Sequence, residues 1–488
     1  MTKNRVEYKD LREWIEKVKA LKELTPINGA KLEEIGPILE LNAMRFGPAL
    51  LFDNIKGYSK GFRVLCGALL NSHRVAMTFG FPADLNTHQL MDALTENLGK
   101  WEKDARSAKY PPEEVSNGPI FENVKRGKDV DMMVFPVPKW HDLDGGPYIG
   151  TADLAITKDP LSDWVNFGCY RTQILDKNHV SNHIEGGHHG AIIRDRYFEK
   201  GKPLPIVMSF SQDPLLFLAA GIEIPYGVSE YNWAGAVRGE STPVVRGKVT
   251  GLPIPVYSEI AVEGFVYKDQ KRTEGPFGEF TGYYGAGARP EYFFKVEALY
   301  HRNDPILLVS PAGKPYACDK TFYYSLMRSV LLQQQLTVSG VPNVKRVWCT
   351  FPGGGRMFNV VSIKQAFPGH AKQAALLASQ LQVGGYMAKL TIVVDEDVDP
   401  TNLNEVMWAT VSRMEAAEDV EILKKCWSSE LDPRIPPEKK ERGELENSRL
   451  VINACRPYDW KDKYPAVCTT DPAILQKVKA KYKAFFPE

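Results

Sequence analysis

The stretches LPIVMSF (204–210) and EIAVEGFVY (259–267) decide the fold class of this chain. Both are rich in β-branched and aromatic residues, and glycine or proline stands near their ends. Four further runs of this kind lie in the same region, namely TADLAITKD, NFGCYRTQIL, VVRGKVTG and YFFKVEALYH. Closely spaced strands with few helices between them predict a barrel or sandwich in the middle of the chain.

The flanking segments have different patterns. Before the strand-rich region we expect an amphipathic helix from Asp10 onward, a second helix at 86–104, and a proline-rich connection at 111–138. Two short apolar runs, 49–55 and 74–81, are interpreted as strands.

Beyond Pro311 the sequence is typical of an α/β unit. Helical patterns at 322–336 and 370–382 alternate there with the strand-like runs VKRVWCTF, MFNVVSIK and KLTIVVDED. The chain ends in a predicted helix with a basic face, DPAILQKVKAKYKAFF.

Composition limits the classes of function. The 488 residues are too many for a single core, and the formal net charge of +1 gives no support for nucleic-acid binding. No stretch has the roughly 20 consecutive apolar residues of a membrane span, and the polar start does not resemble a signal peptide. The seven cysteines are dispersed and odd in number, which favours reduced thiols and a cytoplasmic location.

Four of the nine histidines lie close together, at positions 179, 183, 188 and 189. Neutral imidazole is a common ligand for divalent transition ions, so this cluster indicates a metal site. A hydrated loop with incidental histidines is the other interpretation. The spacing matches no established zinc motif, so further ligands would have to come from elsewhere in the chain.

Other polar residues stand in apolar surroundings. Asn166 and Arg171 lie on a predicted buried strand, where a guanidinium requires a carboxylate partner. Glu230 lies where a loop enters a predicted helix, and such a glutamate is more often a residue of the first helical turn than a ligand. We interpret Glu259 and Glu263 as residues of a strand edge and a charged turn.

The segment EGPFGEFTGYYG (274–285) holds two glutamates five residues apart in a stretch that cannot be a helix. A solvated surface turn is one explanation. In a catalytic explanation, Glu274 orients an arginine, for which Arg171 is the natural candidate, and Glu279 holds a proton to deliver. The triglycine at 353–355 lacks the context of a phosphate loop and is interpreted as a flexible turn. The residues alone therefore indicate a cytoplasmic metalloenzyme that uses acid/base carboxylates.

Five blocks, taken in chain order, resemble the signature blocks of the UbiD family of decarboxylases, which use prenylated flavin mononucleotide. They are NFGCYR, HH, PYGVSEY, SEIAVEG and EGPFGEFTGY. The similarity extends from about residue 47 to residue 400. It implies an α/β (α+β) fold in which a flavin-binding split β-barrel domain is linked by a helix to a C-terminal α/β oligomerisation domain.

The resemblance also implies ligands for the cofactor. Asn166, His189 and Glu230 would bind a divalent ion such as Mn²⁺ that also contacts the cofactor phosphate, and a mixed N/O donor set suits that ion. His188 would touch the flavin, and His179 and His183 would have no role. A potassium ion would lie near the backbone carbonyls of Phe167, Ala219 and Ala220.

Arg171, Glu274 and Glu279 would form the catalytic set. Arg171 would hold the substrate carboxylate, Glu274 would orient Arg171, and Glu279 would protonate the carbon after CO₂ leaves. Lys389 is predicted to face the cofactor phosphate. Phe280 and Tyr323 are predicted to line the substrate pocket, although both could equally be core aromatics.

The resulting hypothesis is a non-oxidative, reversible decarboxylase of an aromatic, heteroaromatic or α,β-unsaturated carboxylic acid. The alternative is a UbiD-like subunit of a multi-component aryl carboxylase that is not active alone. The implied partners are a flavin prenyltransferase that supplies the cofactor and further copies of the chain, as a homodimer or a dimer-based hexamer. The expected division is an N-terminal α/β lobe at 1–115, the split barrel with the active site at 116–308, a dimerisation domain at 309–460 and a tail helix at 461–488.

Overall fold

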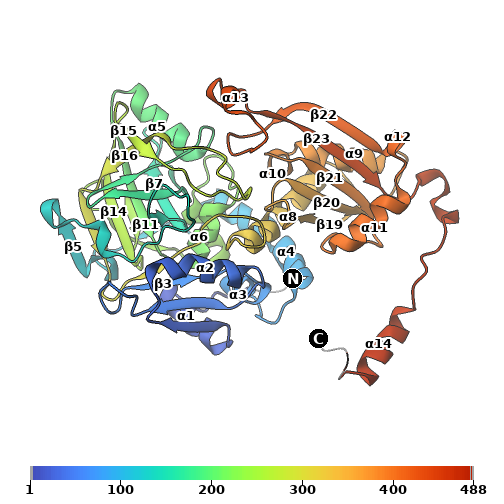
Figure 1. Cartoon of the computed structure of the whole chain (residues 1–488), viewed down its shortest axis with the longest axis horizontal. Helices are drawn as coiled ribbons and strands as arrows, with labels where there is room; N and C mark the ends of the chain where they lie inside the picture. The colour runs from blue at the N-terminus through green and yellow to red at the C-terminus, as the bar shows by residue number, and fades with distance from the viewer. Residues whose placement is uncertain (1–3, 484, 486–488) are drawn as a thin grey trace.

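The computed structural model describes residues 4–483 and 485. The chain forms an N-terminal lobe, a central part built mainly from two sheets, and a C-terminal sheet with helices packed on it (Figure 1). The α/β (α+β) fold expected from the sequence is confirmed. None of the described helices combines the length and the apolar character that a membrane crossing requires.

The N-terminal lobe begins with α1 (Leu11–Ala20), whose first turn is capped by the Asp10 carboxylate accepting from the Glu13 N–H. The helix buries Leu11, Trp14 and two further apolar residues, as its periodicity predicts. Four strands form the adjacent sheet in the order β1 (Leu24–Asn28), β2 (Ala49–Asp53), β3 (Arg63–Cys66) and β18 (Ile306–Leu308). The last strand comes from far along the chain and joins this lobe to the central part.

The prediction of a strand at 74–81 is wrong. Those residues lie largely in α3 (Ser72–Thr78), because the Asn71 side chain accepts the Arg74 N–H and starts a helix there. The other helices of this lobe are α2 (Leu32–Ala43) and α4 (Thr87–Arg106). The second of these confirms the helix expected at 86–104.

The predicted proline-rich connection contains only short elements. They are β4 (Glu113–Glu114), η1 (Pro119–Phe121), β5 (Asn123–Arg126), η2 (Gly127–Asp129) and η3 (Met132–Val134). Of these, β5 pairs with β17 at the edge of a central sheet, so the segment is more than a linker.

Two sheets build the central part, and among the described residues neither closes on itself. The six-stranded sheet has the order β5, β17 (Ala298–His301), β14 (Ile260–Val266), β11 (Leu204–Phe210), β7 (Asp153–Lys158), β8 (Val165–Gly168). The five-stranded sheet has the order β15 (Lys271–Glu274), β16 (Arg289–Lys295), β10 (His179–Ser181), β9 (Thr172–Asp176), β6 (Tyr148–Gly150). A small sheet of β13 (Pro253–Pro255), β12 (Pro243–Arg246) and β4 and three helices, α5 (His189–Glu199), α6 (Pro214–Gly221) and α7 (Glu230–Arg238), complete this part.

Glu259 and Glu263 correct a second expectation, because both are fully buried rather than at a strand edge. The Glu263 carboxylate accepts hydrogen bonds from the Thr250 N–H at 2.7 Å and from the Tyr300 hydroxyl at 2.5 Å. Glu259 pairs with two arginines, one of them on α1. These carboxylates therefore hold neighbouring segments together inside the protein.

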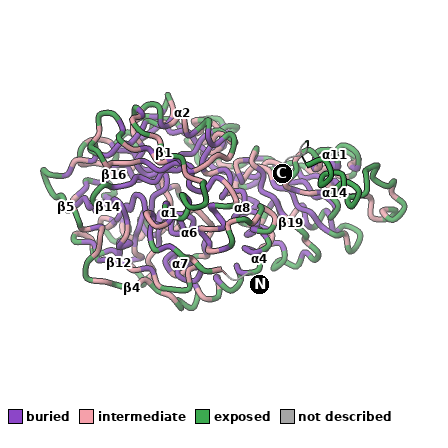
Figure 2. Tube along the Cα trace, turned by 90° about the horizontal axis from the view of Figure 1, so that it is seen from below, coloured by how far each residue is buried: buried purple, intermediate pink, exposed green. Residues whose placement is uncertain are grey.

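Helix α8 (Thr321–Val338) leads into the C-terminal part. The sheet there has the order β19 (Val344–Cys349), β20 (Phe358–Ile363), β21 (Leu390–Asp395), β23 (Glu446–Ala454), β22 (Val420–Trp427). Its other helices are α9 (His370–Gln380), α10 (Gln382–Gly385), α11 (Leu403–Arg413), α12 (Ala416–Asp419) and α13 (Pro437–Glu441). After η4 (Tyr458–Lys463), the tail helix α14 (Pro472–Lys481) stands apart with every residue exposed (Figures 1 and 2).

Candidate active site

Arg171 lies at the break between two strands of different sheets. The run NFGCYRTQIL does not form one strand, because β8 ends at Gly168 and β9 begins at Thr172. The guanidinium is buried and donates from Nε and Nη2 to the two carboxylate oxygens of Glu274, at 2.9 and 2.8 Å. Its Nη1 donates to Glu279 Oε1 at 2.5 Å. The three residues that the sequence grouped therefore meet in space.

Glu274 is the last residue of β15 and is 1% exposed. The Tyr148 hydroxyl donates to Glu274 Oε1 at 2.7 Å, in addition to the two bonds from Arg171. Burial raises the pKa of this carboxyl, but the neighbouring guanidinium outweighs burial, so the pKa of Glu274 is lowered. Burial would lower the pKa of Arg171, and the two carboxylates outweigh that effect and raise it. Glu274 is thus a fixed negative charge behind a fixed positive one.

The loop that carries Glu279 is held by the segment before β6. The Gly145 N–H donates to the Pro276 carbonyl at 2.8 Å, and the Gly278 N–H donates to Asp144 Oδ1 at 3.0 Å. A Cβ on Gly145 would lie 2.0 Å from the Gly275 carbonyl, so the close approach requires glycine there. Since Glu279 is only 8% exposed, the loop is not a solvated surface turn.

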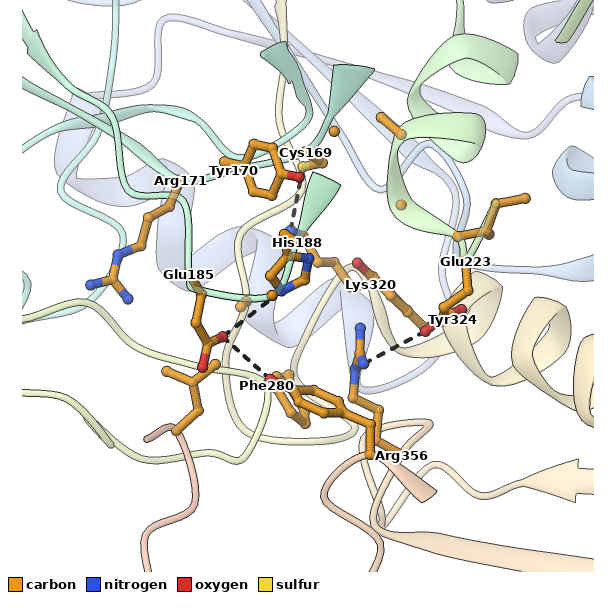
Figure 3. Close-up of a pocket in the computed structure, with 18 of the residues that line it drawn as sticks. Cys169, Tyr170, Arg171, Glu185, His188, Glu223, Phe280, Lys320, Tyr324 and Arg356 are labelled. Atoms are coloured by element: carbon orange, nitrogen blue, oxygen red, sulfur yellow. Dashed lines mark hydrogen bonds and ion pairs between the residues drawn. The ribbon is translucent and has the colours of Figure 1, made fainter. Parts of the chain in front are cut away.

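A cavity of about 510 Å³ opens between the central part and the C-terminal part. This size is within the usual range for small-molecule sites, roughly 300–1,000 Å³. Arg171 and Glu279 line it, whereas Glu274 is not among its lining residues and lies behind the guanidinium. Figure 3 shows Arg171 on one side of the cavity, with His188 and Lys320 nearer its centre.

The three predicted metal ligands also line this cavity. Asn166 Nδ2 donates to Glu230 Oε1 at 2.7 Å, while Asn166 Oδ1 is buried without a hydrogen-bond partner. Burial, partly offset by the Phe167 N–H, raises the pKa of Glu230 to about 8. An unpaired amide oxygen, a buried carboxyl and the His189 imidazole fit a divalent ion with N/O preference. Within the described part of the chain, no cluster of three or more His, Cys, Asp and Glu side chains is placed to bind a metal. A site here would therefore depend on the amide.

The remaining histidines separate into two groups. His188 lines the cavity, and partial burial together with the nearby Arg356 lowers its pKa, which favours a neutral ring. His183 also lines the cavity and pairs with Glu291 at 2.7 Å. His179 pairs with Asp176 at 2.8 Å and is not among the lining residues.

Two predicted residues lie outside the cavity lining. The Lys389 ammonium pairs with the Asp432 carboxylate, and Tyr323 is fully buried against Phe217, with ring centroids 5.3 Å apart. Of the predicted potassium positions, Phe167 and Ala220 line the cavity and Ala219 does not. Phe280 is among the lining residues.

Sequence reasoning missed several cavity residues that come from α8 and the C-terminal part. Lys320 lies beside Cys169, with its Nζ 3.9 Å from the sulfur. Tyr324, Arg356 and Tyr386 also line the cavity, and the Tyr386 hydroxyl donates to the Glu185 carboxylate of the central part at 3.2 Å. No local motif marks them, because their position depends on how the C-terminal sheet docks on the central part.

These features define a class of site, namely a buried Glu–Arg–Glu set at the wall of a cavity large enough for an organic cofactor. Comparison with known protein families supports this class of site. Three models of 3-octaprenyl-4-hydroxybenzoate carboxy-lyase match in chain order: the N-terminal domain at 15–94, the Rift-related domain at 113–315 and the C-terminal domain at 321–454.

Relatives and solved structures extend the match over the chain. Pyrrole-2-carboxylic acid decarboxylase of Pseudomonas aeruginosa is 32% identical over 438 residues, which are 87% of this chain and 86% of the relative. Phenolic acid decarboxylase of Streptomyces sp. (strain D7) is 31% identical over 461 residues, 92% of each chain. The open form of Sedimentibacter hydroxybenzoicus vanillic acid decarboxylase superposes with a TM-score of 0.83 at 28% identity, covering 98% of this chain and 99% of that one. The UbiD-class enzyme HmfF from Pelotomaculum thermopropionicum, in complex with FMN, gives 0.83 at 25% identity over 97% and 100% of the two chains.

The chain therefore belongs to the UbiD family, and it is a carboxy-lyase.

Proposed function

We propose that this protein catalyses the non-oxidative, reversible decarboxylation of an aromatic, heteroaromatic or α,β-unsaturated carboxylic acid with prenylated FMN. The single observation that carries the proposal is the buried Glu274–Arg171–Glu279 arrangement at the cavity wall. The relatives support the substrate class, since they are named as decarboxylases of pyrrole-2-carboxylic acid and of phenolic acids.

Arg171 would bind the substrate carboxylate. A guanidinium has five N–H donors, and three of them are used in the bonds to Glu274 and Glu279. The two that remain can donate to a substrate carboxylate without loss of the contact to Glu274. Because Glu274 holds the guanidinium from behind through two bonds, the substrate meets a positive group whose orientation is already fixed.

Glu279 would move the proton. When the bond between the carboxylate carbon and the rest of the substrate breaks, CO₂ leaves and the electron pair stays on the remaining carbon. Glu279 delivers its proton to that carbon and becomes a carboxylate beside Arg171, which stabilises it. In the reverse direction the same carboxylate removes the proton.

The cofactor would supply an electron sink for the pair left by CO₂. Asn166, His189 and Glu230 would hold Mn²⁺ or a similar ion against the cofactor phosphate, and His188 would contact the flavin. Lys320 lines the cavity, whereas Lys389 does not and pairs with Asp432. Lys320 is therefore the better candidate to bind a negatively charged group of the cofactor. Potassium near the carbonyls of Phe167, Ala219 and Ala220 remains part of the proposal.

We also propose the domain division, the oligomeric state, the source of the cofactor and the cellular location. The division into parts at 1–115, 116–308, 309–460 and 461–488, a homodimer or dimer-based hexamer, and supply of the cofactor by a flavin prenyltransferase are inferences from the family. A neighbouring UbiD-class structure is described as an evolved dimeric form. A cytoplasmic location is supported by the seven cysteines, all of which are unpaired thiols.

The second candidate is a UbiD-like subunit of a multi-component enzyme that is not active alone. One observation favours it: the vanillic acid decarboxylase is named ShVdcCD, and one of its structures contains a truncated ShVdcD. The intact Glu–Arg–Glu set argues for activity of the chain itself.

Co-expression with a flavin prenyltransferase tests the proposal. We expect a purified protein with absorbance beyond that of FMN, and CO₂ release from at least one acid in a panel of aryl, heteroaryl and cinnamic-type acids. A protein that binds the cofactor but releases CO₂ only with a second component would favour the subunit. A colourless protein that releases no CO₂ from any acid of the panel would contradict the proposal that this chain is itself the decarboxylase.

A further inference from the structure

The triglycine at 353–355 and the arginine after it form the turn between β19 and β20, which we name the GGGR turn (353–356). It belongs to the C-terminal part, yet it reaches the cavity wall, where Gly354 and Arg356 are lining residues. Its backbone is held by the fully buried Arg328, whose Nε donates to the Gly355 carbonyl at 2.9 Å. The turn expected from the sequence is present, and these contacts give it a defined place.

The backbone of the GGGR turn packs directly on the loop that carries Glu279. A Cβ on Gly354 would lie 2.8 Å from the Phe280 carbonyl oxygen and 3.0 Å from Phe280 Cδ2. Gly354 also has φ +58°, in the left-handed region that favours glycine. Both observations require glycine at this position, for conformation and for space.

The Arg356 side chain of the turn also contacts Phe280. The Arg356 guanidinium carbon lies 5.3 Å from the Phe280 ring centroid, 5.4 Å from that of Tyr324 and 5.2 Å from that of Tyr386. Its charge is balanced by Glu223 at 3.7 Å. Figure 3 shows Arg356 rising from the C-terminal part beside Phe280 and pointing toward Glu223. Cations over aromatic faces attract the ring quadrupole, so Arg356 fixes the Phe280 ring.

We propose that the GGGR turn is a positioning element for Glu279, acting through Phe280. Phe280 follows Glu279 directly, and it contacts both the Gly354 backbone and the Arg356 guanidinium. The docked C-terminal part thereby completes the catalytic loop of the central part. This inference rests on the proposed role of Glu279 as proton donor. A displacement of about 1 Å at a reacting group can cost on the order of 10²-fold in rate.

Gly354→Ala tests the backbone contact, and Gly127→Ala is its matched control. Gly127 has nearly the same conformation, φ +55°, but a Cβ there would meet no atom within 4 Å. We expect Gly354→Ala to lower kcat by about 10²-fold with KM changed by less than about threefold, because binding is retained and protonation is impaired. Protonation should then limit the rate, so the solvent deuterium isotope effect on kcat should rise. Gly127→Ala should change neither.

Arg356→Gln and Arg356→Lys test the side chain, with the exposed Arg442→Gln as control for loss of an arginine charge. We expect Arg356→Gln to lower kcat about tenfold and to raise the isotope effect, and the lysine variant to recover part of the rate, because an ammonium also attracts an aromatic face. FMN affinity, measured by fluorescence quenching of the apoprotein, should stay within about threefold of wild type, as expected for a residue that does not bind the flavin. This variant also keeps the inference testable if Gly354→Ala does not fold.

The outcomes separate this inference from the proposed function. If Glu279→Gln abolishes turnover while the Gly354 and Arg356 variants keep wild-type kcat and isotope effect, the positioning role is overturned and the proposed function stands. If Glu279→Gln keeps full activity, the proposed proton donor is wrong and the inference fails with it. A loss of FMN affinity in Arg356→Gln that accounts for the lost rate would make Arg356 a cofactor ligand and would overturn the positioning role.

Discussion

Tyr148→Phe removes one hydroxyl that contacts the proposed catalytic set and leaves the other contacts in place. The hydroxyl donates to Glu274 Oε1 at 2.7 Å, and both residues are buried. The ring packs on Phe277 with centroids 4.1 Å apart, and phenylalanine keeps that contact. The substitution therefore tests how firmly Glu274 must be held in order to orient Arg171.

The expected cost follows from the bonds that remain. A hydrogen bond to a charged group contributes roughly 1.5–3 kcal/mol to stability. Glu274 keeps two bonds from Arg171 after the change, so no carboxylate is left unpaired and the cost should lie near the lower end, about 1.5 kcal/mol. Because the Glu274–Arg171 pair loses one of its anchors, we expect kcat to fall about three- to tenfold, the rate equivalent of roughly 0.7–1.4 kcal/mol.

Tyr300→Phe is the matched control. Its hydroxyl donates to the fully buried Glu263 at 2.5 Å, at a place that is not part of the cavity lining. Urea unfolding should show a similar loss of stability in both variants, whereas CO₂ release should fall only in Tyr148→Phe. Equal activity of the two variants would refute the reasoning that Tyr148 positions the Glu274 carboxylate for the proposed reaction.

The pKa of Glu274 is lowered in the folded protein, so its contribution to stability is present above its ordinary value of 4.5 and is lost as the pH falls below it. Urea unfolding between pH 6 and pH 3.5 should therefore show a decline that is smaller in Glu274→Gln, and equal slopes would contradict this. Asn166→Ala should lose bound Mn²⁺ in elemental analysis of the purified holoenzyme, while His179→Ala, outside the cavity, should retain it; equal metal content in both would refute the ligand assignment. Trp14→Ala should destabilise the N-terminal lobe by about 3–5 kcal/mol in the same unfolding assay, because its side chain is fully buried, and a loss under 1 kcal/mol would contradict the packing described.

The sequence predicted the structure best where the pattern within a single segment determines its conformation or its buried face. The apolar spacing of α1 predicts its buried face, and the spacer between Glu274 and Glu279 predicts that both meet Arg171. A buried guanidinium requires carboxylate partners, and the chain offers two on a loop that cannot be a helix. The requirement of a buried guanidinium for carboxylate partners and the conformation of the loop therefore indicate the same two glutamates.

Sequence reasoning failed where position depends on distant segments. The apolar run at 74–81 is compatible with strand or helix, and the cap by Asn71 decides for the helix. Arg356 lies in the turn between β19 and β20, and it lines the cavity because the C-terminal sheet docks on the central part, which no local sequence pattern predicts. Lys389 is predicted from its position before a strand to face the cofactor phosphate, whereas in the structure its ammonium pairs with Asp432.

Turnover by Glu279→Gln, in protein loaded with prenylated FMN, tests the central claim most directly. The amide keeps the size of the side chain but cannot deliver the proton, so CO₂ release should fall by about 10²- to 10⁴-fold, the usual contribution of a general acid. Flavin absorbance and metal content should match those of wild type. Wild-type CO₂ release from a variant that retains both would contradict the account, because Glu279 would then not be the proton donor.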